Sequence, residues 1–189
     1  RRAWARAPPR SNHSPTQDID DTMVLTKAEF IASMQNEVRI LLHLATKIDP
    51  NKVDYRPTPK QRSTLELLRY LSMMGPVMVQ AAKGGGFDGA AWAKEEQVAN
   101  GRDFAQTVAA IGQLPDLYAK ALGAMSDADF RADIEMFGST SSKGAFLVGT
   151  VLCGYAAYRT QLFVYLKASG RTELNTMNLW AGIDAPMGA

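Results

Sequence analysis

Residues that carry metal and redox chemistry are scarce in this chain of 189 residues. It contains one cysteine, Cys153, and two histidines, His13 and His43. One cysteine cannot form an internal disulfide, which fits a reducing compartment, and we expect a cytoplasmic protein. Cys153 lies in an apolar run, where a buried and inert thiol is expected rather than a nucleophile. Two histidines also exclude a metal site built from three imidazoles.

An excess of charge and a long hydrophobic run are missing as well. The formal net charge is +2, but four arginines lie in the first ten residues, which contain no acid, and subtracting them leaves −2 for residues 11–189. The uncharged run at residues 144–158 is shorter than the ~20 apolar residues that span a bilayer. We therefore expect neither a nucleic-acid nor a membrane partner.

Residues 1–22 combine prolines with polar side chains and lack periodicity, which predicts a disordered extension ahead of one folded domain at residues 23–189. No apolar segment follows the basic start, so no signal peptide is predicted. Met23 is an alternative native start, in which case residues 1–22 are an artefact. A transit peptide is disfavoured by the acidic residues Asp18, Asp20 and Asp21.

Capping motifs and apolar periodicity predict four long helices. Thr26 and Glu29 form a capping-box pattern, Ser63 and Glu66 form a second one, and Ser141 or the serine after it caps the last helix. Apolar residues then recur at helical spacing. The predicted helices are residues 27–48, 63–82, 102–123 and 142–169.

This pattern predicts an all-α fold, a four-helix bundle with a long connection between the second and third helices. The connection contains KGGGFDG at residues 83–89, which lacks the preceding strand and the following Lys-Ser/Thr of a phosphate-binding loop. Trp92 is predicted to begin a short helical turn. Residues 126–139 are predicted to be a mixed, partly extended connection. Pro76 and Pro115 are expected to bend or interrupt the second and third helices.

The last helix is predicted to lie in the core, because no charged residue occurs between Lys143 and Arg159. Gly154 and Ala157 are small enough to let neighbouring helices come close. Arg159 itself is expected on a flank of the helix. Several larger apolar residues recur at steps of three and four and therefore share one face: Val151, Tyr155, Tyr158, Leu162 and Tyr165.

Two further charged features are interpreted as structural. His43 falls off the apolar stripe of the first helix and is expected to face solvent or to be half-buried. Arg56, Lys60 and Arg62 precede the second helix and are interpreted as part of a solvated loop. An anion site at the helix start is the alternative, because free backbone N–H groups point out there.

Four segments resemble the DinB-like superfamily of four-helix bundles, also called damage-inducible or YfiT-like proteins. They are RPTPKQRSTLELLRYL at residues 56–71, LGAMSDADF at 122–130, GYAAYRTQLFVYLKASG at 154–170 and NLWAGID at 178–184. The resemblance extends over residues 26–182. It implies one histidine on the second helix and a His-x-x-His-x-x-Gln motif on the last helix. In the family these histidines bind a divalent metal, usually nickel or zinc.

The chain departs from the family at all three histidines. The second-helix position corresponds to Tyr70, and the pair on the last helix corresponds to Tyr155 and Tyr158, followed by the retained Gln161. A phenol with a pKa near 10 is a poor metal ligand at neutral pH. We therefore expect no metal and no other cofactor. The tyrosine rings are expected to fill the space of the lost site, with their hydroxyls bonded to each other, to Gln161 or to water. The alternative is a small polar pocket, with these four residues as candidates for its lining, that binds a neutral or anionic ligand.

Two classes of function follow from the resemblance. The first is a non-catalytic binding or interaction module that pairs as a homodimer or holds a small molecule. The alternative is an enzyme: either a metal-dependent thiol transferase or hydrolase that uses unrecognised ligands, or a metal-free enzyme with tyrosines in acid–base roles. A metal-free enzyme needs a tyrosine with a lowered pKa beside a cation, and no such cation lies on the core stripe.

Overall fold

The computed structural model describes residues 25–185. The predicted N-terminal extension at residues 1–22, which contains His13, lies outside this range, and so does the alternative start Met23. The elements, in chain order, are α1 (Lys27–Ala45), η1 (Pro50–Lys52), α2 (Thr64–Gly84), α3 (Gly89–Asn100), α4 (Phe104–Gly112), α5 (Leu114–Gly123), α6 (Asp127–Arg131), β1 (Asp133–Met136), β2 (Ser139–Ser142), α7 (Lys143–Leu147), η2 (Val148–Leu152), α8 (Cys153–Ala168) and η3 (Met177–Ala181).

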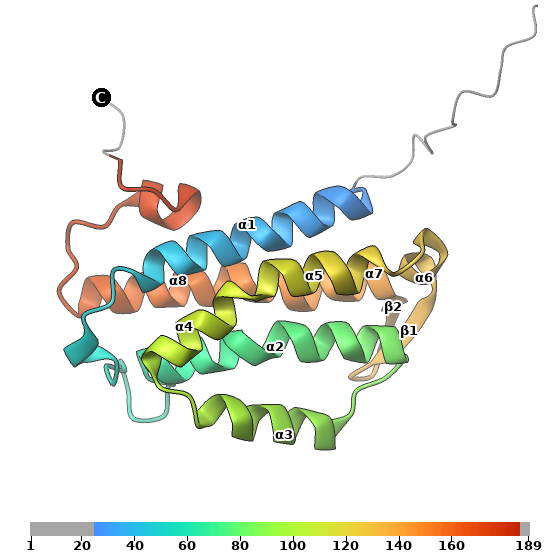
Figure 1. The fold of residues 1–189 in the computed structure, drawn as a ribbon, viewed down its shortest axis with the longest axis horizontal. Helices are drawn as coiled ribbons and strands as arrows, with labels where there is room; N and C mark the ends of the chain where they lie inside the picture. Colours follow the sequence, from blue (N-terminus) through green and yellow to red (C-terminus); the bar gives the residue numbers. More distant parts are fainter. Residues whose placement is uncertain (1–24, 186–189) are drawn as a thin grey trace, which may run out of the picture.

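Four helical arms form a bundle, which confirms the predicted all-α fold (Figure 1). The first arm, α1, packs against α5 and α8, and α2 packs against α4, α5 and α8. The third arm is the α4–α5 pair, and the fourth runs through α7, η2 and α8. The long connection after α2 contains more order than expected, because α3 forms a full helix on the outer side of α2.

The predicted caps are present at three helix starts. Thr26 and Ser63 each close a capping box with the glutamate three residues later. The hydroxyl of Ser142 accepts the backbone N–H of Ala145 at the start of α7. Each such cap stabilises its helix by about 1 kcal/mol, because it provides a partner for an otherwise free backbone N–H.

The two internal prolines act differently from each other. Pro76 lies inside α2, which continues to Gly84 without interruption. The third arm instead breaks at Gln113, and Pro115 stands in the first turn of α5. A proline in the first turn loses no helical hydrogen bond, so Pro115 starts a helix rather than bending one.

The last arm is less enclosed than its uncharged sequence predicts. Cys153 and Ala157 are exposed, which corrects the expectation of a buried thiol and of a core-facing alanine. Gly154 does face a neighbour, since a Cβ atom there would lie 3.1 Å from the Cε of Met74. The uncharged outer face consists of small side chains, so hydropathy alone gives the wrong orientation for it.

Arg159 is buried, with 4% of its surface exposed, rather than on a flank. Its Nε donates to Glu37 of α1 at 2.7 Å, and its Nη1 donates to the carbonyl oxygen of Leu179. The guanidinium also lies 5.6 Å from the ring centroid of Trp180. The arginine therefore joins three segments of the chain: α1, α8 and η3.

The chain after α8 folds back onto α1. The buried amide of Asn178 donates to the carbonyl of Ile183 and to the carboxylate of Asp184, and its Nδ2 lies 3.1 Å from Nε2 of His43. His43 is half-buried as expected, and its burial and the nearby Lys47 lower its pKa. None of the helices within residues 25–185 has the length and apolar content that crossing a membrane requires.

A small hairpin precedes the last arm. Strands β1 and β2 pair antiparallel, with Asp133 opposite Ser142 and Met136 opposite Ser139. The turn consists of Phe137 and Gly138, with φ of 53° and 78°. Two successive positive φ angles are typical of a tight hairpin turn, and the first of them is unusual for a phenylalanine. The hairpin holds Phe137 out at its tip, 67% exposed.

Candidate functional site

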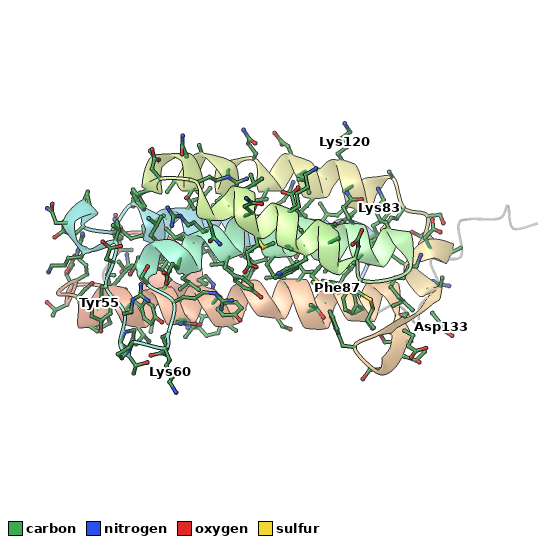
Figure 2. All side chains as sticks on the ribbon, turned by 90° about the horizontal axis from the view of Figure 1, so that it is seen from below. Tyr55, Lys60, Lys83, Phe87, Lys120 and Asp133 are labelled. Carbon is green, nitrogen blue, oxygen red and sulfur yellow. The ribbon has the colours of Figure 1, made fainter. Side chains whose placement is uncertain are left out.

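An aromatic pocket opens between α2, α3, the hairpin and the last arm. Its volume is about 380 Å³, within the range of small-molecule sites. The side chain of Phe87, at the end of the glycine run, lies beside the hairpin (Figure 2). The residues that line this pocket are Tyr70, Met74, Met78, Phe87, Trp92, Phe137, Thr150 and Tyr158.

Five rings follow one another around this pocket. The centroids of Tyr158 and Tyr70 are 5.1 Å apart, and those of Tyr70 and Trp92 are 6.1 Å apart. Phe87 continues the series at 5.8 Å from Trp92, and Phe137 follows at 5.3 Å from Phe87. Neighbouring ring planes are inclined by 51–68°. The rings come from five segments of the chain and form a continuous aromatic wall.

A pair of tyrosines lies deeper in the core. The hydroxyl of Tyr155 donates to the carbonyl oxygen of Leu71 at 2.9 Å and lies 2.6 Å from the hydroxyl of Tyr118. Because a phenol has one proton to donate, Tyr118 is the donor between the two hydroxyls. Both side chains are almost completely enclosed. The hydroxyls meet directly above Gly75, where a Cβ atom would lie 2.0 Å from the oxygen of Tyr118.

Three of these tyrosines, Tyr70, Tyr118 and Tyr155, are held in the protonated form. Burial raises the pKa of Tyr155 and of Tyr118 above the ordinary value, because the core does not solvate a phenolate. Burial, followed by the neighbouring Tyr158, raises the pKa of Tyr70 to about 12, although the nearby Arg62 acts in the opposite direction. These side chains are therefore neutral hydrogen-bonding groups at physiological pH.

Among solved structures, the chain is similar to a DinB-like protein from Bacillus subtilis. The TM-score is 0.61 at 19% sequence identity, and the match covers 77% of this chain and 94% of the other. The chain has a DinB-like fold. Comparison with protein-family models gives no match, and comparison with curated protein sequences gives none either.

Within this DinB-like fold, the four residues singled out from the sequence lie in three places. Tyr70 and Tyr158 form one side of the aromatic pocket. Tyr155 does not line that pocket and lies in the core with Tyr118. The amide of Gln161 donates to the hydroxyl of Tyr165, one turn further along α8. The structure thus brings together two of the four residues in one cavity.

The chemistry of Tyr70, Tyr155 and Tyr158 does not fit a divalent metal. Protonated phenols are poor ligands for zinc and nickel, and the hydroxyl of Tyr155 is already bonded to the carbonyl of Leu71. Within the part of the chain that the structure describes, no three His, Cys, Asp or Glu side chains gather into a group that could hold a metal ion.

Sequence reasoning missed most of the aromatic wall. Phe87, Trp92 and Phe137 come from segments that the sequence places outside the four long helices, and periodicity carries no information there. Tyr118 belongs to an apolar stripe that is visible in the sequence, but its pairing with Tyr155 depends on how the helices pack. The one usable signal was the presence of aromatic residues beside the glycine run, where an exposed loop is expected.

The predicted alternative of an anion site before α2 is not supported by the contacts of its arginines. Arg56 pairs with Glu66 at 3.1 Å. Arg62 lies over the ring of Tyr70, with 4.1 Å between its guanidinium carbon and the ring centroid. Arg62 therefore extends the aromatic cluster on its outer side.

Proposed function

We propose that the chain is a DinB-like protein without the three-histidine metal site, and that it acts as a non-catalytic module that binds a small molecule in the aromatic pocket. The observation that carries the proposal is the position of Tyr70 and Tyr158. Both correspond to metal-binding histidines by resemblance, and both form the wall of a pocket lined mainly by aromatic and thioether side chains. An apolar pocket with a few hydroxyls suits binding.

The protonation of the tyrosines favours binding over catalysis. A general base works best with a pKa near the operating pH. Burial raises the pKa of Tyr70 to about 12, so its phenolate is rare at neutral pH. Tyr155 is even less available, because its hydroxyl is enclosed and bonded to Tyr118 and to the Leu71 carbonyl. Neither of these two tyrosines is therefore suited to abstracting a proton.

The test of pocket binding is ligand-observed NMR on the full chain with a mixed panel of neutral, anionic and cationic fragments. We expect fragments that bind the wild type and lose binding in Tyr158→Leu. The matched control is Phe163→Leu, which removes a half-buried ring from the same helix outside the pocket. A panel without any fragment that depends on Tyr158 would contradict the proposed function.

A second measurement tests the absence of the metal site. Wild-type protein and the triple variant Tyr70→His/Tyr155→His/Tyr158→His are loaded with zinc or nickel, dialysed and assayed for metal. The triple variant is expected to retain more metal, because neutral imidazoles replace weakly basic phenols. Stoichiometric metal on the wild-type protein would refute this part of the proposal.

The proposal includes a cytoplasmic location and self-association through helices. The outer face of α8 supports pairing, since Cys153 and Ala157 are exposed and small enough for a second helix to come close. Sedimentation of the wild type and of Ala157→Arg tests this part. A dimer that the arginine dissociates is expected, and a monomeric wild type would contradict it.

A further inference from the structure

We propose that the group recognised by the aromatic pocket is a quaternary ammonium, a cation that carries no N–H; this inference rests on the proposed binding function. Five of the eight lining residues are aromatic, in a chain with 8% aromatic residues. The other three contribute two thioethers and one hydroxyl. The wall contains no charged side chain, so recognition of charge depends on the rings.

Aromatic rings attract cations through their faces, which carry the negative part of the ring quadrupole. The five rings here line one pocket, and successive ring planes are inclined by 51–68° to each other. The same ring faces repel an anion, and the wall offers an anion only neutral donors, namely hydroxyls and the indole N–H of Trp92. The arrangement therefore favours a positively charged ligand.

The scarcity of acceptors distinguishes among cations. A primary ammonium has three N–H donors and loses stability when they are buried without acceptors. The polar side-chain groups of this wall are the hydroxyls of Tyr70, Tyr158 and Thr150 and the indole N–H of Trp92, which only donates, and the raised pKa of Tyr70 keeps its phenol neutral. A quaternary ammonium requires no acceptor, so it loses the least on entering the pocket.

The existing contacts of Tyr70 show that its ring accepts a cation. The guanidinium of Arg62 lies over this ring at 4.1 Å, within the range of favourable cation–π geometry. Arg62 lines the adjacent polar cavity, not the aromatic pocket. Glu96 lines that same cavity and contributes a negative charge near Tyr70, which offsets the arginine.

The rim of the pocket is formed by two exposed rings in unusual settings. Phe137 adopts a φ of 53°, a left-handed conformation that is unfavourable for a non-glycine residue. Phe87 follows three consecutive glycines and is 41% exposed. A large apolar ring at a strained and exposed tip is more typical of a binding role than of a packing role.

The test is a titration of the full chain with tetramethylammonium, choline and Nε-trimethyllysine, and with 3,3-dimethylbutan-1-ol, the neutral carbon isostere of choline. We expect at least one cation to bind about tenfold more tightly than the neutral isostere, because only the cation gains from the ring faces. Trp92→Leu is expected to remove most of this preference, and Phe163→Leu is expected to bind as the wild type.

Phe137→Leu provides a second variant, because this exposed ring contributes little to the fold and its replacement is expected to weaken cation binding. Thermal melts establish that each variant is folded. Equal affinity for the cations and the isostere, no binding of any of the three cations, or binding that all pocket variants retain would overturn the quaternary-ammonium proposal. Those outcomes would still allow neutral fragments to bind in the pocket. The proposed function itself is contradicted only if no fragment in the NMR panel loses binding in Tyr158→Leu.

Discussion

The hydroxyl oxygens of Tyr118 and Tyr155 lie 2.6 Å apart in the space that Gly75 leaves free. A glycine in the interior of a helix lowers its stability relative to alanine by about 1 kcal/mol. Here the missing side chain makes room for two phenols from α5 and α8, so the two arms are joined to α2 at this point. Gly75, Tyr118 and Tyr155 are best considered as one unit.

The first prediction concerns Gly75. Gly75→Ala introduces a Cβ atom 2.0 Å from the Tyr118 oxygen, so at least one ring must move. We expect the variant to lose about 1–3 kcal/mol of unfolding free energy, measured by urea titration. Gly112→Ala is the control, because a Cβ atom there meets no atom within 4 Å. A Gly75→Ala protein as stable as that control would show that the tyrosine pair is arranged differently.

The second prediction separates the two phenols. Tyr155→Phe removes the donor to the Leu71 carbonyl and the acceptor of Tyr118, and leaves a buried hydroxyl without its partner. We expect a loss of about 1–3 kcal/mol, and a smaller loss of about 0.5–1.5 kcal/mol for Tyr118→Phe. The double variant should lose less than the sum, since the hydrogen bond is counted in both single variants. Additive losses would mean that the two hydroxyls are not coupled.

The third prediction is a loss of stability at alkaline pH. The pKa values of Tyr118 and Tyr155 are raised in the folded state by burial, so their protonated forms stabilise the fold. This contribution is complete below the unfolded-state pKa of about 10 and decreases as the pH rises above it. Urea titrations between about pH 8 and about pH 11 should therefore show a steeper decline for the wild type than for Tyr118→Phe/Tyr155→Phe. Parallel declines would contradict the enclosed state of the pair.

The fourth prediction compares a buried ion pair with an exposed one. Arg159→Met leaves the carboxylate of Glu37, whose side chain is 14% exposed, without its partner, and breaking a buried pair costs about 3–5 kcal/mol, so a loss toward the lower end is expected. Arg56→Met removes the half-exposed pair with Glu66 and is expected to cost no more than about 1 kcal/mol. Thermal or urea unfolding measures both. Similar values for the two variants would mean that Arg159 is solvated.

The predictable part of this fold is the part that local chemistry controls. The caps at Thr26, Ser63 and Ser142 depend on side chains within three residues of the helix start, and all three are present. The three arms that begin at these caps therefore start close to their predicted residues. Pro115 was recognised as a disruption, although the break falls two residues earlier at Gln113.

The parts that could not be predicted depend on partners far away in the chain. Burial of Arg159 requires Glu37 and the returning segment at Leu179, and neither is visible from the sequence of α8. Exposure of Cys153 could not be inferred from an apolar run, because it depends on how the helices of residues 25–185 pack, and they leave this thiol exposed. The aromatic pocket depends on the packing of α3 and on the hairpin turn that places Phe137 beside Phe87.

The segment η2 is a π turn, and this matters when the sequence of the last arm is aligned with those of relatives. A π turn contains one more residue than an α turn, and each residue of an α-helix corresponds to a rotation of about 100°. Removing one residue from Val148–Leu152 would restore regular winding and turn Phe146 and the hairpin relative to Tyr158. The aromatic wall would then lose its terminal contact between Phe87 and Phe137. A one-residue gap at this place in an alignment would thus distinguish relatives that keep this pocket from relatives that share only the bundle.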